Sequence, residues 1–569
     1  MARPSAAVTY DYVIVGAGAA GLLLANRLTE NPDISVAIID PGGDQENNTM
    51  VSDPNAWLAP NDAPPDWDYT SLPQPHAADR SVAFHAGKGL GGSTLINGMA
   101  YLRGNRAEFD AWELLGNPGW NWDSMFEAWL KIEDFIPPTK WQADAGAVYD
   151  PEYYGQGGNL HLGFNPTLNN GSLHADFRDS WGALGVPLNT EANNGTTEGF
   201  YVFPQTLDPT LNRRWDAATG FYRPIVGREN FKLLNGTATE VVWDKDSSPC
   251  TPTASGVKYQ TPEGESVTVS VAKEVILTAG VFRTPLILER SGVGNPAILE
   301  KLGIETVINL PGVGENFIEQ TSNPLLYASK DSASGEGYAP YVALVSASQV
   351  WGEEEAQAIG EETRPLLADW AATVASESKG ALNATALEKQ FEIQHDLIFK
   401  HGVTIGEVFC SGIDENLLGV FWALLPFGRG SIHLQSIDGI NDPGIDPRFH
   451  LVDFDVKMQE HVGRLASKLF ATAPLSDWVG EALAHVDHDA PEEEWRQYMK
   501  QSLESNAHPL GSAAMMPREM GGVVDAELKV HGARRLRVAD ASVMPMQLGG
   551  HLSASVYAVA QRCADMLLS

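Results

Sequence analysis

The stretch Tyr10-Asp-Tyr-Val-Ile-Val-Gly16-Ala-Gly18-Ala-Ala-Gly21-Leu-Leu-Leu-Ala-Asn-Arg-Leu28 decides the fold class. Alternating and then apolar residues before the first glycine predict a buried strand, and the leucines after Gly21 predict a helix that faces a sheet. Gly16 permits the tight turn, Gly18 lets the backbone approach a pyrophosphate, and Gly21 lets helix and strand pack closely. The pattern therefore predicts the strand, turn and helix of a dinucleotide-binding fold.

A second strand and an acidic residue follow at the spacing that this motif needs. Residues 34–39 predict the strand, and Asp40 comes nineteen residues after Gly21. A carboxylate in this place can accept hydrogen bonds from the hydroxyls of the adenosine ribose. The helix N-terminus, which begins at Ala19 and Ala20, supplies amide donors to the phosphates. The motif predicts an α/β fold but does not distinguish FAD from NAD.

The charge of the chain argues against two classes of partner. Its 569 residues include 73 acidic and 38 basic side chains, which gives a formal net charge of −35. This charge would repel a phosphate backbone and an anionic lipid surface. The sequence also contains no apolar run of the roughly 18 residues that a membrane-spanning helix needs. We therefore expect neither nucleic acid nor a membrane as a partner.

Two readings of the localisation stay open. The start Met1-Ala-Arg-Pro-Ser lacks the apolar core of a signal peptide, so the chain is either cytoplasmic or a mature secreted chain whose leader has been removed. Five Asn-x-Ser/Thr sequons favour the extracellular reading. They lie at Asn47, Asn170, Asn194, Asn235 and Asn383.

The cysteines indicate neither a metal cluster nor a disulfide framework. Cys250, Cys410 and Cys563 are far apart and form no CxxC pair. At most one disulfide can form, and at least one thiol must stay free. No metal site is predicted.

A second glycine-rich segment runs from His85 to Met99 (HAGKGLGGSTLINGM). Gly91 and Gly92 would let the backbone lie against a planar or phosphate-bearing ligand. The side chains that follow them could donate hydrogen bonds to that ligand; they are Ser93, Thr94 and Asn97.

This segment, with the Trp112, Gly116-Asn117 and Gly119-Trp120 that follow it, resembles the first signature of the glucose-methanol-choline (GMC) oxidoreductases. Residues 280–294 resemble the second signature and depart from it at Val281. Residues 310–316 are also similar to the family, although Glu319-Gln320 replaces the Asp-His that commonly follows. Further matching segments contain His508, Asp525, Asp540 and His551, so the resemblance extends over the whole length.

The resemblance implies FAD as the cofactor and a set of residues that contact it. Within the family the chain looks most similar to the fungal FAD-dependent glucose dehydrogenases and glucose oxidases, because of residues 97–101, the Phe421-Trp422 run and the His508/His551 pair. The implied cofactor-binding residues are Gly16, Gly18, Ala19, Ala20, Gly21, Asp40, Gly91, Gly92, Ser93, Thr94, Asn97, Gly98, Met99, Ala100, Asp540 and Ala541.

The histidine pair fits the oxidation of an alcohol. A carbinol must lose its hydroxyl proton while a hydride leaves the adjacent carbon for flavin N5. We expect His551 to act as the general base and His508 to hold the substrate oxygen or share the proton, with the two roles interchangeable at this level. His85 could attach the flavin covalently, as a histidine near this place does in some relatives; the simpler interpretation is a surface loop.

The substrate positions depart from the glucose dehydrogenases. Glu504 and Val420 stand where those enzymes have an Arg and a Glu that touch the sugar, whereas Asn506 is retained and Trp422 lies in the adjoining strand. A buried polar group without its partner loses about 1–3 kcal/mol, which puts glucose itself in doubt.

We expect oxidation of a glucose-like sugar or oligosaccharide at the anomeric carbon. A primary or aryl alcohol oxidoreductase is the alternative, and a non-catalytic FAD-binding protein is the third reading. Two questions stay open: whether the electron acceptor is oxygen or a quinone or dye, and whether the protein is a monomer or a homodimer.

The resemblance also implies a discontinuous Rossmann-like FAD-binding domain. Residues 1–60, 228–320 and 515–569 would build it. Residues 61–227 would form the flavin lid and segments of the substrate domain, and residues 321–514 the rest of the substrate domain. The runs 396–399 and 431–435 predict an antiparallel sheet in the second domain. Helices near 364–390 and 454–486 would cover that sheet.

Overall fold

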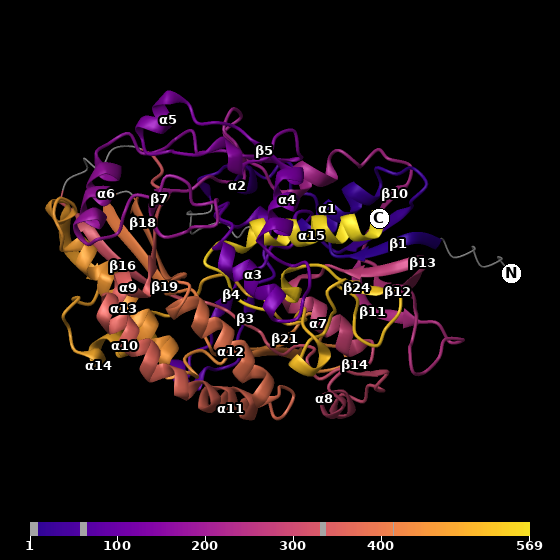
Figure 1. Cartoon of the computed structure of the whole chain (residues 1–569). Helices are drawn as coiled ribbons and strands as arrows, with labels where there is room; N and C mark the ends of the chain where they lie inside the picture. The colour runs from indigo at the N-terminus through magenta and orange to yellow at the C-terminus, as the bar shows by residue number, and fades with distance from the viewer. Residues whose placement is uncertain (1–8, 57–64, 331–336, 414) are drawn as a thin grey trace.

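The molecule is built on two seven-stranded sheets, which lie toward opposite ends of the view in Figure 1. Helices cover both sheets. The computed structural model describes residues 9–56, 65–330, 337–413 and 415–569. The chain start from Met1 to Ser5, on which the reading of the leader rests, lies outside the described residues.

The first sheet is mainly parallel, with strand order β10-β2-β1-β13-β12-β11 and β24 beside β13. Only the β13-β12 and β12-β11 pairs are antiparallel. Its strands are β1 (Thr9–Val15), β2 (Val36–Asp40), β10 (Phe231–Asn235), β11 (Thr237–Trp243), β12 (Ala254–Gln260), β13 (Ser266–Leu277) and β24 (Leu536–Val538).

Helices from the two ends of the chain meet on this sheet. Helix α1 (Ala19–Leu28) follows β1 directly, and the last helix, α15 (Leu552–Leu568), packs beside it. The long α15 crosses the centre of the view in Figure 1, next to α1. The seven strands come from three separate stretches of sequence, which confirms the discontinuous Rossmann-like fold. The domain boundaries themselves stay a prediction.

The second sheet is antiparallel, with strand order β22-β16-β19-β18-β17-β7 and β23 beside β16. An antiparallel sheet in the second domain is what the sequence predicted. Its strands are β7 (Gly199–Val202), β16 (Thr321–Ser329), β17 (Tyr341–Ser346), β18 (Thr404–Ile413), β19 (Asn416–Ala423), β22 (Val479–Ala484) and β23 (Glu504–Ser505).

Helix α13 (Asp453–Phe470) covers one face of the second sheet. Two strand glycines allow this close packing, since a Cβ at Gly406 would lie 2.3 Å from Val462 and one at Gly419 would lie 2.7 Å from Phe470. The opposite face of the sheet is left for the candidate site. The other helices of this half are α9 (Ala347–Trp351), α10 (Glu353–Thr363), α11 (Leu367–Glu377), α12 (Ala384–Phe399) and α14 (Glu492–Ser502).

Two element predictions in this half were wrong, and a third was correct only in part. Residues 396–399 form the last turn of α12 and not a strand. The prediction failed because a short apolar run cannot by itself be told from a buried helix segment. Residues 431–434 form β20, which pairs with β21 outside the second sheet. The helix predicted near 454–486 ends at Phe470: Pro474 cannot continue it, and residues 479–484 form β22.

The remaining elements are short or lie around the two sheets. They are α2 (Thr49–Ser52), α3 (Arg106–Leu114), α4 (Trp122–Ile132), α5 (Lys140–Asp144), α6 (Leu173–Ala183), α7 (Gly280–Arg290), α8 (Pro296–Lys301), β3 (Tyr69–Thr70), β4 (Ala83–Phe84), β5 (Glu133–Phe135), β6 (Leu160–Leu162), β8 (Leu207–Asp208), β9 (Arg213–Arg214), β14 (Val293–Gly294), β15 (Ile308–Asn309), β20 (Ser431–Leu434) and β21 (Pro443–Asp446).

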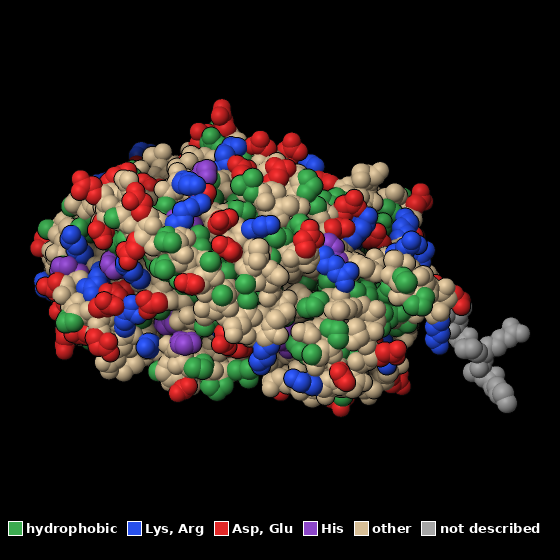
Figure 2. Space-filling view, turned by 60° about the horizontal axis from the view of Figure 1, so that its bottom comes forward, with side chains coloured by type: hydrophobic (Ala, Val, Ile, Leu, Met, Phe, Trp, Pro, Cys, Tyr) green, Lys and Arg blue, Asp and Glu red, His purple; other side chains and the backbone are tan. Residues whose placement is uncertain are grey.

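The acidic side chains are spread over the surface. On the face shown in Figure 2, Asp and Glu lie among fewer Lys and Arg and do not gather in one patch. In the described part of the chain, no helix combines the length and the apolar character that crossing a membrane requires.

Candidate active site

The two glycine-rich segments lie against each other at the N-terminus of α1. A Cβ at Gly92 would come within 2.8 Å of the Gly18 Cα. Gly16 has φ +106°, and a Cβ there would lie 2.4 Å from the Thr278 carbonyl oxygen, so the turn needs glycine. A Cβ at Gly21 would lie 2.0 Å from the Gly16 oxygen, which accounts for the third glycine. The structure therefore joins two motifs that are about 70 residues apart, as two adjacent backbones do when they enclose a phosphate group.

The start of α1 suits an anion. No acidic residue lies in its first turn, and no side chain in the described part of the chain caps it, so the amides of Ala19 and Ala20 face outward with the positive end of the helix. Asp40 lies at the end of β2; its carboxylate accepts hydrogen bonds from Ala17 N and Gly42 N, both at 2.7 Å. Burial raises the pKa of Asp40 despite these bonds. These residues fit the adenosine and pyrophosphate parts of FAD.

The segment after Gly92 is held mainly by its own hydrogen bonds. Thr94 Oγ1 donates to Gly91 O at 2.6 Å and accepts from Ala217 N, while Ser93 Oγ accepts from Gly87 N. The hydroxyl of Thr94, expected as a donor to the ligand, is therefore used inside the protein. Asn97 Oδ1 accepts from Arg214 Nη1 at 2.7 Å, which leaves its amide nitrogen for a ligand.

Residues 98–100 continue toward the C-terminal helix. Gly98 O accepts a hydrogen bond from Gln205, and Met99 adopts φ +61° with its side chain fully buried. Ala100 O accepts from Ser553 Oγ in the first turn of α15. This part of the first signature is thus tied to the helix that begins beside His551.

Asp540 joins the second signature to the C-terminal segment. Its Oδ2 accepts from Gly280 N at 2.9 Å and from Thr284 Oγ1 at 2.8 Å, so it caps the start of α7. Its Oδ1 accepts from Ser542 N, and Ala541 O accepts from Gly511 N. Asp540 is fully buried, and its contacts are structural; Ala541 follows it at the surface of this junction.

His508 and His551 lie together although 43 residues separate them. Their ring centroids are 4.7 Å apart and their planes are nearly perpendicular, at 84°. His551 is the N-cap residue of α15, and its backbone N donates to Leu102 O. His508 follows β23, and burial together with the nearby His551 holds the pKa of His508 well below its usual range. The ring of His508 is therefore neutral at ordinary pH.

The two glycines before His551 are required by close packing. A Cβ at Gly550 would lie 2.6 Å from Gly104 N. A Cβ at Gly549 would lie 2.8 Å from Thr404 Oγ1, and Gly549 N donates to both oxygens of Glu108 at 2.9 Å. Burial raises the pKa of Glu108 to about 7. The loop that presents His551 is thus fixed from both sides.

The sequence analysis missed Glu407, which the structure places beside the pair. His551 Nε2 donates to Glu407 Oε1 at 3.0 Å, and the Glu407 side chain has no exposed area. Glu407 lies in β18 opposite Trp422 of β19. A charged residue inside the apolar run of residues 403–410 was the signal that could have found it.

Trp422 and Val420 point to the face of the second sheet that carries Glu407. The Trp422 ring centroid is 6.4 Å from that of His551, and Val420 is paired with Phe409 in β18. Asn506 contacts the His508 ring, with its Nδ2 3.0 Å from His508 Nδ1. Glu504 and Trp422 both pair with Ser322 of β16, one on each side, so the three residues lie in one row across the sheet. It is exposed, so it lies at the edge of this face rather than beside the histidines.

His85 lies on the surface, directly after β4. Its side chain is 62% exposed, and its Nδ1 contacts Asp66 Oδ2 at 2.6 Å. This hydrogen bond raises the pKa of His85. The contacts agree with the surface-loop interpretation of this residue.

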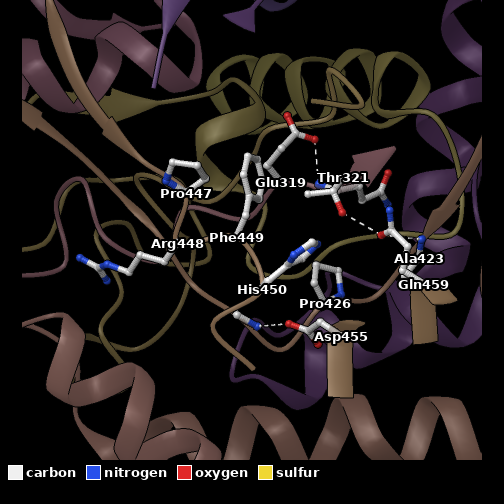
Figure 3. Close-up of a pocket in the computed structure, with 12 residues that line it drawn as sticks. Glu319, Thr321, Ala423, Pro426, Pro447, Arg448, Phe449, His450, Asp455 and Gln459 are labelled. Carbon is white, nitrogen blue, oxygen red and sulfur yellow. Dashed lines mark hydrogen bonds between the residues drawn. The ribbon is translucent and has the colours of Figure 1, made fainter. Parts of the chain in front are cut away.

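A small cavity lies between the segment at Glu319 and the start of α13 at Asp455 (Figure 3). It holds about 30 Å³, enough for one or two water molecules. Glu319, Asp455 and Gln459 line it, but neither His508 nor His551 does. Burial raises the pKa of Glu319 to about 8. The two histidines therefore do not border this cavity, although Gln320, which contacts His508, does.

A dinucleotide fold whose last helix starts at one of two adjoining histidines defines an oxidoreductase built around a bound cofactor. The chain belongs to the GMC oxidoreductase family, whose N-terminal part matches residues 10–322 and whose C-terminal part matches residues 426–560. The resemblance seen in the sequence is thereby confirmed, and the chain is an enzyme with FAD as its cofactor.

Relatives match over nearly the whole chain. A glucose oxidase-like protein from Humicola fuscoatra is 43% identical over 562 residues, covering 98% of this chain and 95% of that protein. A glucose oxidase from Penicillium chrysogenum is 34% identical, covering 98% and 92%. A solved structure of a fungal aryl-alcohol oxidase superimposes with a TM-score of 0.87 at 28% identity, covering 98% of this chain and 99% of that one. A solved FAD-dependent oxidoreductase from Chaetomium thermophilum gives the same TM-score at 27% identity, covering 98% and 99%.

Proposed function

We propose that the enzyme oxidises a sugar at its anomeric carbinol, with His508 and His551 acting on the hydroxyl group. The observation that carries the proposal is the histidine pair, 4.7 Å apart, with a buried carboxylate behind one member. When bound, FAD supplies the two-electron acceptor for the hydride of the carbinol carbon. The protein has to hold the hydroxyl, take its proton and exclude water.

The contacts favour His508 as the base, which reverses the roles expected from the sequence. An ionised carboxylate only accepts hydrogen bonds, so the His551 nitrogen that faces Glu407 carries a proton. This contact fixes the orientation of the His551 ring beside the position proposed for the substrate oxygen. His508 is kept neutral by burial and can take a proton. His551 would then orient the substrate oxygen while His508 removes its hydrogen.

Polar atoms on the sheet face support a substrate with several hydroxyls. Three buried polar atoms there find no hydrogen-bond partner among the described residues: Glu407 Oε2, Trp422 Nε1 and Tyr201 Oη. Tyr201 pairs with Val342, which pairs in turn with Phe409 on its other side. The side chains of Tyr201, Glu407 and Trp422 therefore lie on one face of the sheet. Burial leaves such groups destabilised by about 1–3 kcal/mol each unless a ligand or water pairs with them. A sugar offers hydroxyls for this purpose.

Apolar side chains on the same face favour the second candidate, an aryl alcohol. The Phe203 ring lies 6.2 Å from the His551 ring and 6.5 Å from the Phe409 ring, and Val420 adjoins them. An aromatic ring would pack here in edge-to-face contacts. Val420, which stands where the glucose dehydrogenases have a polar residue, also favours an apolar substrate.

A substrate panel with one matched variant separates the two candidates. Glucose, cello-oligosaccharides, xylose and benzyl alcohol would be compared with a dye acceptor, in the wild type and in Trp422→Phe. If a sugar is the substrate, removal of the indole N–H raises its KM about tenfold, the loss of roughly one hydrogen bond. If benzyl alcohol is preferred and the variant leaves its KM unchanged, the aryl alcohol candidate is correct. If none of the four is oxidised by yellow, FAD-loaded protein, the histidine pair does not have the proposed role.

We also propose that the protein acts outside the cell. The sequon residues Asn47, Asn170, Asn235 and Asn383 are exposed, as attached glycans require. The reaction needs a small-molecule substrate and an electron acceptor. Comparing peroxide formation with dye reduction on the best substrate decides between oxygen and a quinone-type acceptor.

A further inference from the structure

We propose that Gln320 is a positioning residue that fixes the tautomer of His508, with the proton on Nδ1 and the lone pair of Nε2 turned toward the substrate. The proposal rests on the function proposed above, in which His508 takes the substrate proton. It concerns the residue that departs from the usual family pattern after residues 310–316.

The orientation of the Gln320 amide is determined by its surroundings. The side chain is buried, and its Nε2 donates to two backbone carbonyls, Leu424 O at 2.9 Å and Leu548 O at 3.4 Å. A carbonyl oxygen cannot donate, so the nitrogen of the amide must face these two atoms. Its oxygen then has to point the other way, toward the histidine.

The amide oxygen determines which ring nitrogen of His508 carries the proton. Gln320 Oε1 lies 2.8 Å from His508 Nδ1. The Asn506 amide nitrogen lies 3.0 Å from the same ring nitrogen, but it donates to Gln320 Oε1. Gln320 Oε1 only accepts, and its second lone pair faces Nδ1, so Nδ1 is the donor. A neutral imidazole has a single N–H, so Nε2 keeps its lone pair. The opposite tautomer would leave two acceptors facing each other in a buried place, which is strongly unfavourable.

Further contacts keep the ring from turning away. Asn506 N donates to Gln320 O, and the Asn506 amide nitrogen lies 3.2 Å from Gln320 Oε1. His508 N donates to Glu319 Oε1, and Gln547 Nε2 donates to His508 O at 2.9 Å. Residues 319 and 320 thus have different tasks: Glu319 holds the backbone of the loop, and Gln320 holds the ring.

The two histidines become chemically different as a result. His551 presents a proton to Glu407, and His508 presents a lone pair on the side away from Gln320. An alcohol beside them would meet the lone pair of His508 Nε2, whereas the Nε2 proton of His551 is held by Glu407. A base that waits in the wrong tautomer cannot take the proton, and such an error lowers turnover by up to about 10⁴-fold in a comparable imidazole.

The test measures the tautomer directly. FAD-loaded enzyme labelled with ¹⁵N-histidine would be examined by long-range ¹H–¹⁵N correlation, with His508 assigned from the spectrum of His508→Asn. In the wild type we expect a protonated Nδ1 and an unprotonated Nε2. In Gln320→Leu we expect loss of this preference, a fall in kcat/KM of at least about tenfold carried by kcat, and little change in KM.

Gln394→Leu is the matched control. Gln394 is also buried; it donates to Leu425 O, the neighbour of Leu424, and accepts from Arg429, but it does not contact a site histidine. This variant removes an equivalent buried amide and should keep the His508 tautomer and kcat/KM. A protonated Nε2 in the wild type, or an unchanged tautomer in Gln320→Leu, would overturn the proposal. If no alcohol is oxidised, the proposed function fails, while the tautomer measurement still decides the role of Gln320.

Discussion

Glu407 Oε1 lies 3.0 Å from His551 Nε2, and this contact joins the second sheet to the first turn of the last helix. The carboxylate is fully buried, and its second oxygen has no partner among the described residues. A buried carboxylate in this place orients the imidazole ring and determines which of its nitrogens is the donor.

Glu407→Gln should lower the rate of substrate oxidation by about 10²-fold, because an amide keeps the shape but is no longer an acceptor-only, charged partner of His551 Nε2. Stopped-flow measurement of anaerobic flavin bleaching would give this rate. Glu407→Asp, which keeps the charge but shortens the reach, should lie between the two. A rate within twofold of the wild type in Glu407→Gln would show that the charge has no part in the reaction.

His508→Ala should lose about 10²–10⁴-fold in turnover while it keeps its yellow cofactor, since general base catalysis has this size and the predicted FAD contacts lie elsewhere. His551→Ala should also lose orders of magnitude. The rate of bleaching and the visible spectrum of each purified variant test this. Near-normal turnover in either variant would remove that histidine from the mechanism.

His433 should make the fold less stable in alkaline solution. Burial alone would lower the pKa of His433, but hydrogen bonds with Glu289 and Glu315 outweigh it and raise that pKa to about 10. A raised pKa means that the stabilisation is complete below pH 6.5 and is lost as the pH rises through about 10. Thermal unfolding between pH 6 and pH 10, read by circular dichroism, should show a falling midpoint.

His433→Gln is the variant that tests this assignment. It should be about 3–5 kcal/mol less stable near neutral pH, because two carboxylates lose their buried partner. Its midpoint should also change less with alkaline pH than that of the wild type. An identical pH dependence in the two proteins would assign the alkaline loss to another group.

Gly92→Ala should reduce FAD content. The added methyl group would lie 2.8 Å from the Gly18 Cα, and the φ of +55° at this position already disfavours a side chain. The ratio of flavin to protein absorbance measures the effect. Gly43→Ala is the control: its nearest neighbour would be the Gln45 side chain at 3.8 Å, so full cofactor content is expected. Equal content in both variants would contradict the close contact of the two glycine-rich segments.

Glycans should be found on the exposed sequons when the protein is made in a secretory eukaryotic host. Endoglycosidase treatment should lower the mass, and substitution of Asn47, Asn170, Asn235 or Asn383 by Gln should remove single steps of that change. Asn194 is partly buried, and its Oδ1 accepts from Thr196 N, so Asn194→Gln should have little effect. A protein of unmodified mass would argue against the extracellular proposal.

The sequence predicted what depends on local backbone constraints. Gly16, Gly18 and Gly21 belong to one turn, and their roles follow from the spacing alone. Gly549 and Gly550 are required for another reason, which only the structure shows: a Cβ at either would meet the atoms of Thr404 or Gly104.

Contacts that depend on distant strands could not be predicted. Glu407 reaches His551 because of the register of β18 against β19, and Gln320 reaches His508 because β16 lies beside β23. Thr94 shows another limit: its residue type suggested a hydroxyl donor to the ligand, but a carbonyl three residues away takes its hydroxyl proton, and a cofactor contact through its other atoms stays a prediction. A short polar side chain near its own backbone often makes such a local bond.

The late position of β24 and α15 has a consequence for how the enzyme is made. The strand that completes the cofactor sheet starts at residue 536, and the helix beside α1 starts at residue 552. During translation, the glycine-rich turn of residues 16–21 is therefore made long before β24 and α15, the elements that complete the site. Stable capture of the flavin becomes a late step of biogenesis, and nascent or C-terminally clipped chains should emerge colourless.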